Sequence, residues 1–391
     1  MPKEDRSRTI STPLSAAGQL VSALPVTVKM ATLVPRDSPW FLVLMEVADK
    51  WRKLSNGRVR ITLYGGGTQG DDPDVVENMR VGILQGAVLS SVGIAEIEKS
   101  VYALSIPMAY DSYDEVYAVL EKMRPRLEAA MEANGFVVLN WADAGWIRFF
   151  ATKPVTTPDD LKKLKLFQWN GDRASLAIWK AAGFNPRPAS LPDLRTGLWT
   201  GLFNACSLTP ELALIGRYFE RASYMTDLGW AVLLGATVIK KDIWARIPAE
   251  FRPGLLQAMQ EAGVKLQTIT RQNSETDVEA MMKKGLTVVP VDAKAQELWR
   301  ATAENAYGMI RGNLVPADVF DEALKYRDEY RKQKAAKKGA VAAPQSQNLK
   351  VNPTTLHFEE ESHAPGRSGL SQRNAKGLTQ PIASRMRPAD A

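Results

Sequence analysis

The alternation of strand-like and helix-like segments from Val26 onward restricts the fold of this chain more than any other feature of its sequence. Strand-like segments are rich in β-branched residues, and helix-like segments carry apolar residues three and four positions apart. They follow one another as a strand at 26–34, a helix at 40–55, a strand at 58–64, a helix at 73–84 and a strand at 86–93. This order predicts an α/β fold built on an open sheet with helices on both faces.

A second series of the same kind predicts a second lobe. Strands are expected at 136–143, 164–169 and 202–207, with helices at 113–134, 173–182 and 192–201. The apolar run at 230–239 is typical of a central strand buried on both faces. Residues 248–285 then predict about 55 Å of helix. We expect one helix that spans both lobes; two helices broken near Asn273 and Ser274 are the alternative.

Histidine and cysteine are nearly absent, and this excludes several chemistries. The two histidines, His357 and His363, both follow Lys334, and Cys206 is the single cysteine. Ser-His-Asp and Cys-His catalysis, histidine-based metal sites and disulfides are therefore excluded from the expected folded region. We expect no catalytic residue, no metal and no cofactor. Cys206 as a lone nucleophile stays open, although a free cysteine is more often a small buried hydrophobe.

The net charge of +7 does not indicate a nucleic-acid partner. Residues 334–391 carry nine basic and four acidic side chains, so most of the excess lies in this segment rather than in the expected lobes. The segment is rich in Ala, Gly, Ser, Gln, Asn and Pro without periodicity, and we expect a low-complexity, disordered tail. The sequence contains no apolar run long enough to cross a membrane, so only peripheral contact with a membrane is expected.

Residues 1–25 are an ambiguous leader. Lys3, Arg6 and Arg8 resemble the charged start of an export signal, and residues 21–23 resemble a cleavage site of small residues. Acidic residues dilute that charge, and polar residues interrupt the apolar stretch that follows. We expect a poor or vestigial export segment.

Several strings, in a fixed order from about Val26 to Arg331, resemble the DctP-type solute receptors of TRAP transporters. They are KMATLVPRDSPW from Lys29, NGRVRITLYGGGTQGDD from Asn56, GWIRFFATKPVTTPDDLKKLKL from Gly145, LRTGLWTGLFNA from Leu194 and GATVIKKDIW from Gly235. The resemblance implies a two-lobed clamp of the periplasmic-binding-protein type (type II-like), with a hinge and a long helix spanning both lobes. The expected division is lobe I at 26–145 plus about 229–270, and lobe II at 146–228 plus about 271–331.

The resemblance also implies two arginines that face the cleft from successive strands of the second lobe. Arg148 occupies the first position, whereas Phe167 stands at the second, and Asn204 stands where similar receptors commonly carry Asp. Because a guanidinium pairs a carboxylate bidentately, the replacement by Phe167 puts the usual grip on an acid in doubt. Arg148 lies among aromatic residues and needs an anionic or carbonyl partner there, either a ligand or a structural carboxylate.

Aromatic and hydroxyl side chains complete the candidate ligand site. Ligand pockets are mostly apolar with a few placed polar groups, and core packing is the alternative role for each ring. Phe167 and Trp169 share one strand face and are favoured over Gln168 on the other. Serines at strand ends are further candidates, because open α/β sheets bind ligands there. The candidates beside Arg148 are Trp40, Trp141, Trp146, Phe167, Gln168, Trp169, Ser90, Ser91 and Ser207.

These expectations together describe a periplasmic receptor without enzyme activity. The resemblance implies that it binds a small organic acid by hinge closure and delivers it to the membrane permease subunits of a TRAP transporter. A monocarboxylate with an apolar body fits one arginine and several aromatic rings. A ligand-sensing partner of a signalling protein on the same fold is one alternative, and an enzyme acting through Cys206, Lys or carboxylates is another.

Overall fold

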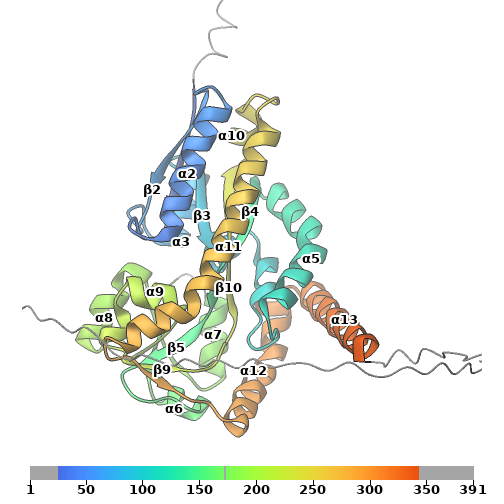
Figure 1. The fold of residues 1–391 in the computed structure, drawn as a ribbon. Coiled ribbons are helices and arrows are strands. Elements are labelled where there is room, and N and C mark those ends of the chain that lie inside the picture. Colours follow the sequence, from blue (N-terminus) through green and yellow to red (C-terminus); the bar gives the residue numbers. More distant parts are fainter. Residues whose placement is uncertain (1–24, 171–172, 343–391) are drawn as a thin grey trace, which may run out of the picture. The chain divides into compact units, whose positions relative to one another are not determined.

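Two β-sheets organise the part of the chain that the structure describes, a computed structural model that covers residues 25–170 and 173–342 (Figure 1). The first sheet has five strands in the order β2-β1-β3-β10-β4. In it β1 is parallel to β2 and β3, whereas β10 runs antiparallel to β3 and β4. Its strands are β1 (Val26–Thr32), β2 (Val59–Tyr64), β3 (Gly86–Ser90), β4 (Phe136–Trp146) and β10 (Val232–Lys240).

The second sheet has six strands in the order β11-β9-β5-β8-β6-β7. In it β6 is parallel to β7 and β8, and β5 is antiparallel to β8 and β9. Its strands are β5 (Arg148–Ala151), β6 (Lys165–Trp169), β7 (Asn185–Ala189), β8 (Ala205–Leu208), β9 (Tyr224–Thr226) and β11 (Thr287–Val289). The mixed α/β fold with two sheets confirms the predicted fold class.

At two neighbouring places a strand of one sheet leads directly into a strand of the other. The chain leaves the first sheet at Trp146 and enters the second at Arg148, and it returns between β9 and β10. The two crossing segments are joined by backbone hydrogen bonds, from Ile147 N to Ala231 O at 2.8 Å and from Trp230 N to Ile147 O at 2.9 Å. A short paired ribbon therefore connects the two lobes.

Helices cover both sheets, and their starts follow from side-chain caps. Ser38 accepts a hydrogen bond from Phe41 N and caps the first long helix, and Asp71 and Asp74 form a capping box at the next. The α-helices are α2 (Pro39–Leu54), α3 (Asp72–Arg80), α4 (Ser91–Ala95), α5 (Tyr113–Ala133), α6 (Pro158–Lys162), α7 (Arg173–Ala181), α8 (Leu194–Thr200), α9 (Pro210–Ile215), α10 (Lys241–Arg246), α11 (Arg252–Met282), α12 (Ala293–Asn313) and α13 (Ala317–Ala342). Three 3₁₀ turns are η1 (Lys99–Ser105), η2 (Leu191–Asp193) and η3 (Tyr218–Glu220).

Helix α11 belongs to both lobes. Its 31 residues correspond to about 46 Å. Near its start, Leu255 and Met259 pack into the apolar cluster of α2 and the first sheet, whereas Met281 near its end packs into a cluster of the second sheet. Figure 1 shows it beside α2 and β4 and reaching α9, which it contacts. The expectation of one spanning helix is confirmed, and the helix is continuous through Asn273 and Ser274.

Helix α13 lies elsewhere than the sequence suggested. Lobe II is expected to include residues from about 271 to 331, yet Val319, Phe320 and Ala323 pack into the apolar cluster that contains α5 and the first sheet. Ion pairs between Arg126 and Glu322 and between Lys122 and Glu329 join α13 to α5. The helix also continues past residue 334, the expected start of the tail, to residue 342. The position of α13 depends on these contacts, which are distant in sequence. Residues 1–24 and 343–391, with the expected leader and most of the tail, lie outside the described residues.

Candidate functional site

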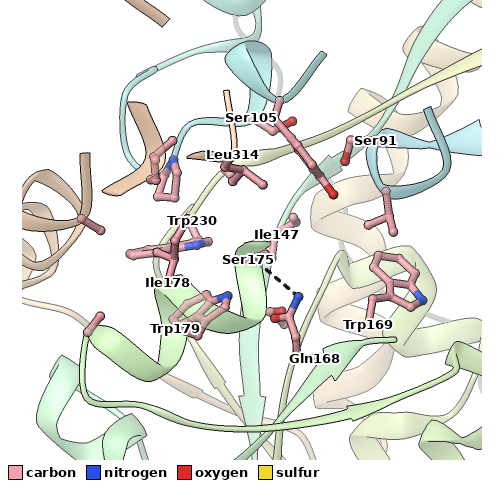
Figure 2. A pocket seen from close by; sticks show the side chains of 18 of the residues that line it. Ser91, Ser105, Ile147, Gln168, Trp169, Ser175, Ile178, Trp179, Trp230 and Leu314 are labelled. Atoms are coloured by element: carbon pink, nitrogen blue, oxygen red, sulfur yellow. Dashed lines mark hydrogen bonds between the residues drawn. The ribbon is translucent and has the colours of Figure 1, made fainter. Parts of the chain in front are cut away.

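A cavity of about 150 Å³ lies where elements of the first sheet meet elements of the second (Figure 2). We call it the ring-walled cavity. Ser91 at the start of α4 and Ser105 at the end of η1 line it from the first-sheet side. Strand β6 and helix α7 line it from the second-sheet side, and α12 contributes Ile310. The β6 and α7 residues are Phe167, Gln168, Trp169, Ser175, Ile178 and Trp179.

Aromatic rings form much of its wall. The rings of Trp179 and Trp230 lie 5.5 Å apart at 30°, and Phe184 meets Trp179 edge-on at 4.8 Å. Sequence reasoning missed these three residues and Ile147, all of which line the cavity. The sequence could have indicated Ile147 and Trp230, because each lies in a segment that crosses between the lobes. These segments place both side chains beside the cavity.

Gln168 holds the central polar position in β6. Its amide Nε2 donates to Ser175 Oγ at 3.3 Å, and Figure 2 shows the side chain facing the cavity. Phe167 is 2% exposed and packs edge-on against Phe203 at 5.3 Å, so most of its ring belongs to the core. Alternation along the strand is as predicted, but the face that carries Gln168 adjoins α7 and the cavity. The favoured pair, Phe167 and Trp169, also contributes to the lining.

The predicted serines divide between two places. Ser91 and Ser207 line the ring-walled cavity. Ser90 instead caps α4 by accepting from Val92 N, and its hydroxyl donates to Asp72 Oδ2. Ser90 therefore serves the start of the helix and lines a neighbouring cavity.

This neighbouring cavity of about 80 Å³ contains two carboxyl groups, and we call it the carboxyl cavity. Burial raises the pKa of Asp72 to about 7 in spite of the hydrogen bonds from Ser90. Burial, reinforced by Asp277, raises the pKa of Glu211 to about 7. Trp40 lines the cavity, and its indole donates to Thr270 Oγ1 of α11 at 3.2 Å.

Arg148 lines a third cavity, of about 520 Å³, which we call the arginine cavity. Its guanidinium pairs with Asp227, and its side chain is 23% exposed. Trp146 lines the same cavity, whereas Trp141 is buried in the core and donates its indole N–H to Glu128 at 3.0 Å. The structure thus gives Arg148 the partner expected of a structural ion pair, and its role toward a ligand stays a prediction.

Asn204, the other departure from the expected pattern, has a structural contact. Its side-chain oxygen accepts a hydrogen bond from Lys165 N, and its backbone N–H donates to Lys165 O at 3.0 Å. These bonds connect the start of β6 with the residue that precedes β8. Asn204 therefore supports the strands that carry the lining residues.

The described residues that line the ring-walled cavity carry no formal charge, because none of them is Asp, Glu, Lys, Arg or His. Cys206 is fully buried in the apolar cluster behind Phe167, and burial raises the pKa of its thiol above the ordinary value. Among residues 25–170 and 173–342, no group of three metal-ligating side chains gathers, and no helix has the length and apolarity needed to cross a membrane.

Two lobes joined by a paired ribbon and a shared long helix, with a cavity between them, define the class of two-lobed solute-binding clamps. The chain belongs to the bacterial extracellular solute-binding protein family 7, DctP, whose family model matches residues 30–311. This membership confirms the resemblance found in the sequence.

Relatives and solved structures agree with this family. The 2,3-diketo-L-gulonate-binding periplasmic protein YiaO of Escherichia coli is 24% identical over 250 residues, 63% of this chain and 76% of that protein. The C4-dicarboxylate-binding periplasmic protein DctP of Rhodobacter capsulatus is 24% identical over 271 residues, 68% and 80% of the two chains. TRAP periplasmic solute-binding proteins from Roseobacter denitrificans, with bound β-D-glucuronate, and from Shewanella oneidensis, with bound succinate, share the fold. Their TM-scores are 0.71 and 0.72 at 19% and 18% identity, covering 76% and 78% of this chain and 99% of each structure.

Proposed function

We propose that this chain is the solute receptor of a TRAP-type transporter. It captures a small organic molecule between its lobes in the periplasm and delivers it to membrane permease subunits. The observation that carries the proposal is the ring-walled cavity, enclosed between the two sheets of a family member. Its mostly apolar lining with a few polar groups is typical of small-molecule sites.

The connection between the lobes supports binding by hinge closure. The hydrogen-bonded ribbon at Ile147 and Trp230 is a short segment in which small backbone rotations change the angle between the sheets. Closure brings Ser91 of the first lobe and Gln168 of the second to one ligand. The buried ligand then stabilises the closed form, which is the state that a permease recognises.

The ligand proposed for the receptor is a small organic molecule with an apolar body. The relatives named above bind organic acids according to their names, and the sequence favoured a monocarboxylate held by Arg148. The apolar body fits the aromatic wall at Trp179 and Trp230. Binding of a carboxylate group would depend on Arg148, which lines the arginine cavity instead. The charge of the ligand is therefore considered separately below.

Binding without turnover is the test of this function. Purified protein is dialysed, incubated with a deproteinised metabolite extract of the cells that produce it, and followed by thermal unfolding. A solute at about 100 times its dissociation constant stabilises the native state by about 2.7 kcal/mol, which raises the melting temperature by several degrees. Mass spectrometry then identifies the retained compound and shows whether it is chemically unchanged. If the whole extract produces no stabilisation and no compound is retained, the receptor function is rejected.

A further inference from the structure

We propose that the ring-walled cavity selects a solute that has one flat ring, one or two hydrogen-bonding groups and no negative charge, and rejects carboxylates. This inference rests on the receptor function proposed above and specifies the class of solute that this cavity takes. It differs from the organic acids that appear in the names of the relatives.

The described lining residues offer an anionic group no cation. A carboxylate moved from water into an apolar site needs a paired cation or several hydrogen-bond donors to offset its lost hydration. None of the described lining residues is cationic. Arg148, which follows the lining residue Ile147, is paired with Asp227 in the arginine cavity, and the second expected arginine position holds the buried ring of Phe167. An anion in this cavity would therefore be desolvated without compensation.

The carboxyl cavity adds a further disadvantage for an anion. It shares Trp169 and Leu233 with the ring-walled cavity, so the two spaces lie on either side of these side chains. Asp72 and Glu211 line it. When ionised, they repel a negative group, and when protonated, they offer it no counter-charge. The neighbouring carboxyl groups and the lack of cations among the described lining residues therefore both disfavour an anion.

The shape of the cavity favours one ring. Trp179 and Trp230 present rings 5.5 Å apart, and Trp169 stands across the cavity from them in Figure 2. Flat apolar groups gain both area burial and offset stacking against such walls. A volume of about 150 Å³ matches that of a protein cavity known to accommodate benzene. The body of the solute is therefore comparable to a single six-membered ring.

Gln168 supplies the polar recognition. A glutamine amide has two N–H donors and a carbonyl acceptor, and only one N–H is used by the 3.3 Å bond to Ser175. It can therefore receive and give hydrogen bonds to a neutral amide, alcohol or ketone. Ser91 and Ser207 line the cavity on opposite lobes and add hydroxyl groups to the same solute. This donor and acceptor set is neutral and suits a neutral partner.

Charge fractionation of the extract tests the inference. Ion exchange at pH 7.5 divides the metabolite extract into neutral, anionic and cationic fractions, and each is added to the dialysed protein. We expect thermal stabilisation from the neutral or the cationic fraction and none from the anionic fraction. Stabilisation by the anionic fraction overturns this inference and leaves the receptor function standing. Stabilisation by no fraction overturns both.

Two variants assign the binding to this cavity, and one serves as a control. Gln168→Leu removes the amide, and we expect affinity for the stabilising fraction to fall about tenfold or more, the effect of losing one buried hydrogen bond. Ser207→Ala is a milder second variant in the same wall, with an expected fall of severalfold. Gln296→Leu makes the same change in the arginine cavity and should leave affinity unchanged. If both cavity variants fold and bind like the unmodified protein, the cavity assignment is wrong.

Discussion

Ile147 and Arg148 are consecutive residues whose side chains line different cavities. Ile147 lines the ring-walled cavity, and Arg148 lines the arginine cavity, where it pairs with Asp227. The separation follows from strand geometry, because successive side chains of an extended chain point to opposite faces. The family's first arginine position, when matched to Arg148, therefore falls in the arginine cavity. The position one residue earlier, Ile147, faces the ring-walled cavity instead.

Replacing Arg148 tests its role directly. We expect Arg148→Ala to change solute affinity by less than about twofold and to lower the free energy of unfolding by about 1 kcal/mol or less, since the ion pair with Asp227 is partly exposed. Calorimetric titration and urea unfolding measure the two quantities. Asp227→Ala, which breaks the same pair from the other side, is the matched control. Loss of binding in the arginine variant alone would restore Arg148 as the ligand anchor.

Cys206 should be chemically silent in the native protein. It is fully buried, and burial raises the pKa of its thiol, so the reactive thiolate is scarce at neutral pH. We expect a thiol reagent to label it only as fast as the protein opens, and to label it at once in denaturant. Rapid labelling of the folded protein would contradict this burial.

A Cys206→Ala variant extends this test to catalysis. It should bind solute normally at a stability cost of about 1 kcal/mol, comparable to losing one buried methylene. Product formation by the unmodified protein that is lost in this variant would support the enzyme alternative. Mass spectrometry of the retained compound provides the measurement.

Two glycines should respond to alanine in opposite directions. In β10, a Cβ on Gly235 would lie 2.7 Å from the backbone oxygen of Leu89, and the paired strands on both sides leave little freedom to move. Gly235→Ala should lower the free energy of unfolding by about 1–3 kcal/mol. In α12, a Cβ on Gly308 meets nothing within 4 Å, so Gly308→Ala should raise it by about 0.5–1 kcal/mol. Urea unfolding of both variants compares the signs, and a stable Gly235→Ala protein would contradict the register of β10.

The carboxyl cavity predicts a pH dependence of stability. Burial raises the pKa of Glu211 from its ordinary value of 4.5 to about 7, so the folded state holds this proton over a range in which the unfolded state has lost it. The unfolded state binds fewer protons between these values, and stability therefore falls as pH rises from about 4.5 to about 7. The slope for one such group reaches at most about 1.4 kcal/mol per pH unit.

Glu211→Gln should remove this contribution to the pH dependence of stability. The glutamine cannot ionise, so the variant is expected to gain stability relative to the unmodified protein at pH 8 and little at pH 4.5. Glu279→Gln, an exposed change on α11, is the control and should not alter the profile. Urea unfolding at both pH values provides the comparison, and parallel profiles for the unmodified protein and Glu211→Gln would contradict the burial of this carboxyl.

The sequence predicted the fold better than the site. Residues 26–93 show clear strand and helix periods, and a long helical run predicts α11. Both are local patterns, and the packing of the folded chain reinforces them. The position of α13 was not predictable in this way, because it depends on how Val319 and Phe320 meet α5. The site depends on similar long-range contacts: Trp230 lies beside Trp179 only because the ribbon and α7 come together.

The residues predicted for the site divide according to the same cause. Ser91, Ser207, Phe167, Gln168 and Trp169 line the ring-walled cavity, since each follows or belongs to a strand whose position the pattern located. Which side of β6 adjoins the cavity was not readable, because it depends on where α7 packs. Trp40 and Ser90 line the carboxyl cavity, and Trp146 and Arg148 the arginine cavity. Their roles in binding stay predictions.

Trp169 and Leu233 line both the ring-walled cavity and the carboxyl cavity, so these two side chains stand between the two spaces. A solute of one ring, as proposed, would fit on one side of them, away from Asp72 and Glu211. We expect a longer solute to displace the indole and to enter a compartment whose carboxyl groups change charge near neutral pH. Leu233→Ala would thin this boundary, and it should make the receptor accept longer solutes.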